Sequence, residues 1–175
     1  MPIYIALLRG INIGKHNKIS MQQQQTIVES CGFENVKVVL NTGNIVFDAA
    51  NLPTEIVEKM LQNAIQQQTG YTISVWVIPQ THLKTLVANC PWANQVVIPH
   101  IKYYMSLIKD ETLLNNIDAN RFNNATFQVV AVYQKAIFFT INALLPTTKA
   151  MDYLEKYFKK EITTRNWKTI QKLVS

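Results

Sequence analysis

Cysteine, glycine and proline are scarce in this chain, and charged residues make up only 16% of its 175 residues. The two cysteines, Cys31 and Cys90, lie far apart in the sequence, which is typical of two buried thiols rather than of a disulfide framework. The small numbers of glycine and proline exclude collagen-like and low-complexity chains, and 48% hydrophobic residues exclude general disorder. A chain of this length can bury a full hydrophobic core without a disulfide or a metal.

Long hydrophobic runs are absent as well. No stretch approaches the roughly 18 consecutive apolar residues that a membrane-spanning helix needs. The apolar segment at residues 3–8 reaches Arg9 too soon for the hydrophobic region of a signal peptide, and no basic segment precedes it. We therefore expect a cytoplasmic protein without membrane partners.

The net charge of +6 is unevenly distributed along the chain. Residues 1–88 carry six basic and five acidic side chains, whereas residues 89–175 carry eleven and six. Most of this excess lies in residues 149–175, where seven basic side chains accompany three acidic ones. Such a bias is typical of a solvated helix face, and it also attracts phosphate-bearing partners.

The first 78 residues alternate between strand-like and helix-like patterns. Ser20 and Gln23 form a capping box that starts a helix, and Gly32 ends it. Pro53 opens a second helix, which Gly70 closes. Strands are expected at residues 4–8, 36–40, 45–47 and 73–78. The resulting β-α-β-β-α-β order is the ferredoxin-like, or split βαβ, order.

The second half shows a related but looser α/β pattern. Helices are expected at residues 81–90, 111–117, 148–160 and 164–174, and strands at 101–107, 127–132 and 136–141. No internal repeat is visible at the level of residues. The prediction is therefore an α+β protein of two closely packed lobes, a ferredoxin-like lobe at residues 1–78 and a second α+β lobe at residues 79–175 that ends in two helices.

Residues 9–18 (RGINIGKHNK) combine two glycines with basic side chains, just before the N-terminus of a helix. The segment differs from a phosphate-binding P-loop, because the spacing from Gly10 to Gly14 is one residue too short and His16 follows Lys15 where a hydroxyl residue is required. Two interpretations stay equally open: a plain connecting loop, and a loop whose backbone N–H groups and cations bind an anion.

Two further polar segments stand at the ends of expected elements. Residues 41–44 (NTGN) have the composition of a tight hairpin turn, and their amides and hydroxyl are also suited to contact a ligand. In residues 163–167 (TTRNW) a threonine is expected to cap the last helix, which places Arg165 in the first helical turn, where a cation is locally unfavourable. Arg165 is therefore expected either to contact a ligand or to form an ion pair between the lobes.

Sequence signatures of catalysis are absent. His16, His82 and His100 are scattered, so we expect no metal site. No nucleophile elbow and no recognisable pair of carboxylates occurs. We predict no cofactor, identify no catalytic residue, and leave open whether the protein is an enzyme.

Several segments together resemble a known family. They are residues 6–14 (ALLRGINIG), 17–21 (NKISM), 32–33 (GF), 41–47 (NTGNIVF), 163–169 (TTRNWKT) and 172–173 (KL). This combination is similar to the bacterial domain-of-unknown-function family sixteen ninety-seven, DUF1697, across essentially the whole chain. The resemblance implies a two-lobed α+β fold with ferredoxin-like halves, and it implies no established activity.

The chain departs from the family pattern at two positions. Lys15 stands where the family tends to have a second glycine, which makes the 9–18 loop bulkier. Gln24 stands where the family tends to have leucine, which puts a polar group on a helix face expected to be buried. Either Gln24 forms hydrogen bonds or the helix packs less deeply than in the family.

The leading functional hypothesis is a protein that binds a small phosphate- or carboxylate-bearing ligand in a cleft between the lobes. Guanidinium groups hold such anions in a bidentate manner. The residues predicted to bind the ligand are Arg9, Gly10, Asn12, Lys18, Thr42, Asn44, Thr164, Arg165 and Asn166.

Two other classes of function are alternatives. In a structural or interaction protein the same motifs would only hold the lobes together. An RNA- or DNA-binding module is the second alternative, because split βαβ sheets often bind RNA and the C-terminal region is basic. Residues 44–47 (NIVF), however, lack the paired aromatics of an RNA-recognition motif.

Overall fold

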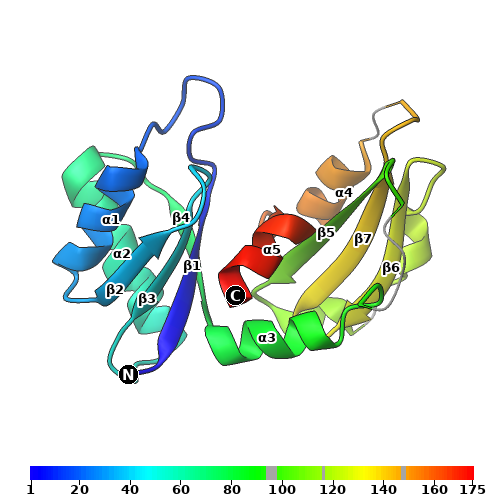
Figure 1. Ribbon diagram of the computed structural model, residues 1–175. Helices are drawn as coiled ribbons and strands as arrows, with labels where there is room; N and C mark the ends of the chain where they lie inside the picture. The colour runs from blue at the N-terminus through cyan, green and yellow to red at the C-terminus, as the bar shows by residue number, and fades with distance from the viewer. Residues whose placement is uncertain (94–97, 116, 147–148) are drawn as a thin grey trace. The chain divides into compact units, whose positions relative to one another are not determined.

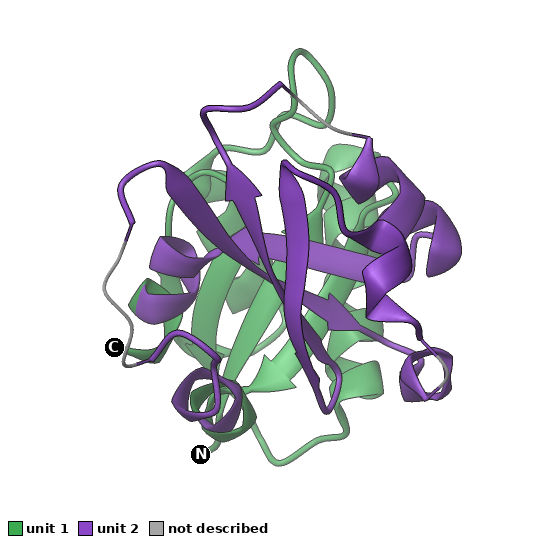
Figure 2. Cartoon of the chain, turned by 90° about the vertical axis from the view of Figure 1, so that its right-hand side faces the viewer, with its two compact units in different colours: residues 1–84, 172–175 green, residues 85–171 purple. Residues whose placement is uncertain are grey.

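The computed structural model describes residues 1–93, 98–115, 117–146 and 149–175, which form two compact units (Figure 2). Unit 1 comprises Met1–Lys84 and Lys172–Ser175, and unit 2 comprises Thr85–Gln171. Each unit contains one four-stranded antiparallel sheet with helices, which confirms the predicted α+β class. Compact units do not by themselves define folding domains, so the division at residues 78 and 79 stays a prediction.

Unit 1 has the element order that the sequence predicts (Figure 1). Its elements are β1 (Ile3–Arg9), α1 (Met21–Ser30), β2 (Glu34–Val38), β3 (Asn44–Asp48), α2 (Thr54–Thr69) and β4 (Ser74–Pro79). The strands lie in the order β2-β3-β1-β4, and every neighbouring pair is antiparallel. The chain then continues into α3 (Gln80–Ala88).

The local signals in the sequence explain where the helices of unit 1 begin and end. Ser20 Oγ accepts a hydrogen bond from the Gln23 backbone N–H at 3.1 Å, and the Ser20 N–H donates to Gln23 Oε1 at 2.9 Å, so the predicted capping box is confirmed. Gly70 directly follows α2 with a left-handed φ of +75°, and Gly32 follows the C-cap Cys31 of α1 with a left-handed φ of +79°. Both helix ends are therefore confirmed as glycine stops.

The core of unit 1 lies between its sheet and the two helices on one face of that sheet (Figure 1). Alternate residues of each strand point to this face because side chains in a strand alternate with a period of two. The strand contribution includes Tyr4, Ala6, Leu8, Ile45, Phe47, Val75 and Val77, and the helix contribution includes Ile27, Val28, Val57, Leu61 and Ile65.

Unit 2 repeats the topology of unit 1. The residue pattern indicated only a looser relation between the two halves, whereas the family resemblance implied ferredoxin-like halves. Its elements are β5 (Ile101–Ile108), the 3₁₀ helices η1 (Glu111–Leu114) and η2 (Ala119–Phe122), β6 (Phe127–Tyr133), β7 (Ala136–Asn142), α4 (Ala150–Tyr157), β8 (Ile162–Asn166) and α5 (Trp167–Val174). The sheet order is β6-β7-β5-β8, all antiparallel. Counting strands along the chain, this is the same second-third-first-fourth order as in unit 1. Two short 3₁₀ helices occupy the place of α1.

The prediction of a helix from residue 164 is wrong. Residues 162–166 form β8, which pairs with β5, and α5 begins at Trp167. The adjacent β-branched residues Thr163 and Thr164 favour an extended backbone. Asn166 Oδ1 accepts hydrogen bonds from the Thr169 N–H at 2.9 Å and the Thr169 hydroxyl at 3.0 Å, so an asparagine and not a threonine caps α5. Arg165 therefore lies on a strand and not in a first helical turn.

The turn at residues 40–44 lies against the end of β1. The Leu8 N–H donates to the Gly43 carbonyl at 2.8 Å. A Cβ atom added at Gly43 would lie 2.7 Å from Leu8 Cβ and 3.0 Å from the Leu8 carbonyl oxygen. Gly43 also has a left-handed φ of +76°. Only glycine therefore satisfies both the space and the backbone conformation at this position.

We predict that Gly43→Ala lowers the free energy of unfolding by about 2–5 kcal/mol, because steric overlap of about 1–3 kcal/mol adds to left-handed strain of about 1–2 kcal/mol. Gly70→Ala is the matched control, since Gly70 has the same φ but open space around its Cβ position. This control should lose only the strain contribution. Urea denaturation of both variants measures the difference, and equal losses would show that the approach to Leu8 is unimportant.

Candidate functional site

The 9–18 loop of unit 1 is a narrow hairpin. The Asn12 N–H donates to the Asn17 carbonyl at 3.1 Å, and the His16 N–H donates to the Ile13 carbonyl at 3.0 Å. At the base of the hairpin, Asn17 Nδ2 donates to the Gly10 carbonyl at 2.9 Å. The side chain of Asn17 thus replaces a backbone pairing and fixes the base, while residues 13–16 form an exposed tip.

Asn12 connects this loop to the 40–44 turn. Its Nδ2 donates to the carbonyls of Ile19 at 2.9 Å and Asn41 at 2.8 Å, and it lies 3.0 Å from Asn41 Oδ1. Its Oδ1 accepts from the Ile19 N–H at 3.0 Å. Because both polar atoms of this amide are engaged within the chain, Asn12 holds the loop in one conformation.

The cations of the loop have two different environments. Lys15 and Lys18 are exposed and form no ion pair or side-chain hydrogen bond with any residue that the structure describes. Arg9 is partly buried at the end of β1, beside Gly10, whose φ is +75°. The loop therefore presents positive charge on a backbone that its own asparagines fix.

Thr42 and Asn44 occupy the turn predicted for residues 41–44, and the turn interpretation is confirmed. Asn44 is fully buried, and its Nδ2 donates to the Val39 carbonyl at 3.0 Å and to Thr42 Oγ1 at 2.9 Å. The Val39 N–H in turn donates to the Asn44 carbonyl at 2.7 Å. Within unit 1, the Asn12–Asn41 contacts bring this turn next to the 9–18 loop.

The other three predicted ligand residues lie in unit 2, side by side on β8. The hydroxyl oxygens of Thr164 and Ser106 are 2.7 Å apart, which links β8 to β5. Arg165 Nη1 donates to Thr163 Oγ1 at 3.1 Å and to the Thr164 carbonyl at 2.9 Å. Burial lowers the pKa of the Arg165 guanidinium to about 10, so it remains a cation at neutral pH. Asn166 caps α5 as described above.

Gln24 is buried, and it forms hydrogen bonds on one side only. Its Nε2 donates to the Ile19 carbonyl at 3.0 Å and to Asn41 Oδ1 at 3.4 Å. Its Oε1 has no hydrogen-bond partner among the described residues, although the side chain is only 1% exposed. The helix thus packs deeply at this position, and one buried acceptor stays unpaired.

We predict that Gln24→Leu raises the free energy of unfolding by about 1 kcal/mol. The substitution removes an unpaired buried acceptor, whose desolvation costs about 1–3 kcal/mol, and leaves the Ile19 and Asn41 acceptors bonded to Asn12. Chemical denaturation measures the change. A loss of stability would show that the two Gln24 hydrogen bonds outweigh the unpaired oxygen.

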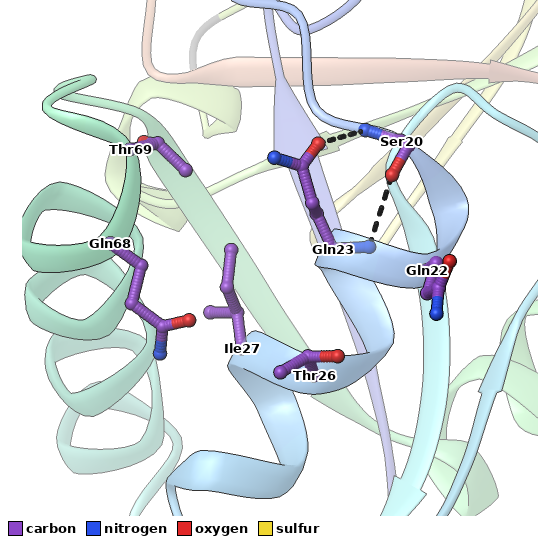
Figure 3. A pocket seen from close by; sticks show the side chains of 7 residues that line it. All are labelled: Ser20, Gln22, Gln23, Thr26, Ile27, Gln68 and Thr69. Atoms are coloured by element: carbon purple, nitrogen blue, oxygen red, sulfur yellow. Dashed lines mark hydrogen bonds between the residues drawn. The ribbon is translucent and has the colours of Figure 1, made fainter.

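The described residues line several cavities within single units, among them three that were not predicted from the sequence. A groove of about 230 Å³ between α1 and α2 is lined mainly by uncharged polar side chains (Figure 3). In unit 2, a cavity of about 260 Å³ is lined largely by apolar and aromatic residues, Trp92, Tyr103 and Trp167 among them. Another in unit 2, of about 320 Å³, is lined by Arg121, Phe122, Tyr153, Lys156 and Tyr157. The spacing of Tyr153, Lys156 and Tyr157 on a helix was the available signal for the last one.

A model for a protein family of unknown function, DUF1697, matches residues 1–138. The chain belongs to the DUF1697 family. Among solved structures, the conserved bacterial protein SP0830 from Streptococcus pneumoniae is similar, with a TM-score of 0.70 and 19% sequence identity over 99% of this chain and 97% of that chain. At this identity the likeness shows the fold alone. No curated protein matches the chain.

This DUF1697 chain offers neither a metal site nor a membrane span in the part that the structure describes. No group of three or more histidine, cysteine or acidic side chains is placed to hold a metal ion there. No described helix is both long enough and apolar enough to cross a membrane. The family assignment agrees with the resemblance stated from the motifs, and it assigns no activity.

The two cysteines of this DUF1697 chain are free, and burial raises the pKa of both thiols. A raised pKa means less thiolate at any pH below it, and the thiolate is the reactive form. We predict that iodoacetamide alkylates the native chain several-fold more slowly than free cysteine at pH 8. The rate should also rise with a midpoint at higher pH than that of free cysteine. Mass spectrometry before and after denaturation measures this, and equal native and denatured rates would contradict it.

Proposed function

We propose that this protein binds a small anionic ligand, carrying a phosphate or a carboxylate, through the 9–18 loop of unit 1. One observation carries the proposal: the loop has two exposed cations on a fixed backbone. Lys15 and Lys18 form no ion pair or side-chain hydrogen bond in the described chain, and Asn12 and Asn17 fix the loop backbone. A loop that is already ordered loses little conformational entropy when it binds, so its cations are well suited to hold an anion.

The neighbouring residues of the loop support the same chemistry. Arg9 and Gly10 stand at its base, and a guanidinium can hold a phosphate or carboxylate with two parallel hydrogen bonds. Electrostatic attraction and positioning suffice for binding, so the proposal requires no nucleophile and no cofactor. Thr164, Arg165 and Asn166 in unit 2 stay predictions from the sequence, and the proposal for the loop does not use them.

A structural or interaction role is the second candidate, and one observation favours it. The side chains of Asn12, Asn44, Thr164 and Asn166 all form hydrogen bonds within their own unit. Residues of this kind are needed for the fold whether or not a ligand binds. Ile13, 66% exposed at the tip of the loop, would then be available for contact with another protein.

A thermal-shift screen separates the two candidates. We would test inorganic phosphate, pyrophosphate, glucose 6-phosphate and citrate. A ligand at 100 times its Kd adds about 2.7 kcal/mol, which raises the Tm of a chain of this size by roughly 5–10 °C. We expect one of these anions to give such a shift and Lys15→Ala/Lys18→Ala to abolish it, because two charges that face the anion are lost.

The matched control is Lys37→Ala/Lys59→Ala, which removes two exposed lysines of unit 1 that lie outside the loop. This variant has the same net charge as the loop variant, so it should keep the shift. Loss of the shift in both variants would indicate nonspecific attraction. The absence of any shift in the unmodified protein would favour the structural role.

A further inference from the structure

The cavity of about 320 Å³ in unit 2 combines aromatic rings with cations. It lies where η2 meets α4, and Arg121 and Phe122 come from the first element and Tyr153, Lys156 and Tyr157 from the second. Its volume is at the lower end of the range for small-molecule sites. No acidic side chain is among the described residues that line it. The cavity therefore suits a ligand that has a planar ring and a negative charge.

Arg121 is held in place by two rings. Its guanidinium carbon lies 5.8 Å from the centroid of the Phe122 ring and 5.5 Å from that of the Tyr157 ring, which are cation–π distances. The two rings meet edge to face at 5.6 Å, and Phe122 is buried. Stacking on rings engages the face of a guanidinium and leaves its N–H edge able to donate. No described residue accepts a hydrogen bond from that side chain.

The α4 side of the cavity supplies a second cation and an exposed ring. Tyr153 is 62% exposed, and Lys156 and Tyr157 follow it by three and four residues, which puts all three on one helix face. Lys156 is exposed and forms no ion pair with the described residues, Asp152 one turn earlier included. An exposed tyrosine beside two available cations is an arrangement that stacks a base and neutralises its phosphate.

We propose that this cavity binds a nucleoside monophosphate, with the base stacked on Tyr153 and the phosphate held by Arg121 and Lys156. The volume favours one nucleotide over a longer strand. This site is separate in unit and in residues from the 9–18 loop, so the inference does not rest on the function proposed above.

Calorimetric titrations at low ionic strength test the ligand class. They use the full chain with Lys15→Ala/Lys18→Ala, so that the 9–18 loop does not bind the phosphate. The probes are AMP, adenosine and ribose 5-phosphate, which present ring plus phosphate, ring alone and phosphate alone. We expect AMP to bind about tenfold more tightly than either part, since stacking and charge pairing both contribute. Equal binding of AMP and ribose 5-phosphate would overturn the inference, as would the absence of AMP binding. Tighter binding of a single-stranded oligonucleotide would also overturn it.

Variants test the residues. Tyr153→Ala and Lys156→Ala should each weaken AMP binding about tenfold, whereas Tyr153→Phe should retain it because the ring remains. The matched control is Lys168→Ala, which removes an exposed lysine of α5 in the same unit. The same losses are expected in the Lys15→Ala/Lys18→Ala background, in which binding of the phosphate at the 9–18 loop does not contribute. Unchanged affinity in both Tyr153→Ala and Lys156→Ala would overturn the assignment.

Discussion

The close approach of Gly43 to Leu8 is the contact on which the predicted ligand loop depends. It places the 40–44 turn directly on the end of β1, with a backbone hydrogen bond of 2.8 Å between the two residues. That position brings Asn41 to the amide of Asn12, which then holds the 9–18 loop. A side chain at residue 43 would push the turn away from β1 and release Asn12 from its acceptor. The absence of a Cβ atom at residue 43 thus supports one of the contacts that hold a loop thirty residues earlier in the sequence.

The fold of unit 1 could be predicted because each element carries its own local signal. The capping box at Ser20 and the stops at Gly32 and Gly70 act over a few residues and do not depend on the rest of the chain. Unit 2 lacks such a local signal at residues 162–166. A threonine pair before an apolar helix is typical of a helix cap, and only pairing with β5 shows that residues 162–166 form the fourth strand. Without β8, the repeat of the unit 1 topology is invisible in the sequence.

Predicting the site was harder for a related reason. Polar residues at the ends of strands suit both ligand binding and the closing of turns, and the sequence alone does not distinguish these uses. The side-chain amides of Asn12 and Asn44 form hydrogen bonds with backbone groups of other residues in unit 1, because a buried polar group needs a partner. Lys15 and Lys18 have no such internal use in the described chain. Burial and hydrogen-bond partners therefore support one of the nine predicted positions, Lys18, as the basis of the proposed site, and they add Lys15, which was not among the nine.

The structure also helps to interpret the excess of basic side chains in the second half of the chain, because it shows the surroundings of Arg121 and Lys156. A solvated helix face would explain the exposed Lys156 on α4, but it would not require Arg121 to lie over two aromatic rings from different elements. Ordering a long side chain costs conformational entropy, which the cation–π contacts offset. The ordered guanidinium borders a cavity whose described lining holds no acidic side chain, next to Tyr153 and Lys156. An ordered and accessible cation such as Arg121, beside an exposed ring such as Tyr153, is typical of a binding site rather than of a surface that only keeps the protein in solution.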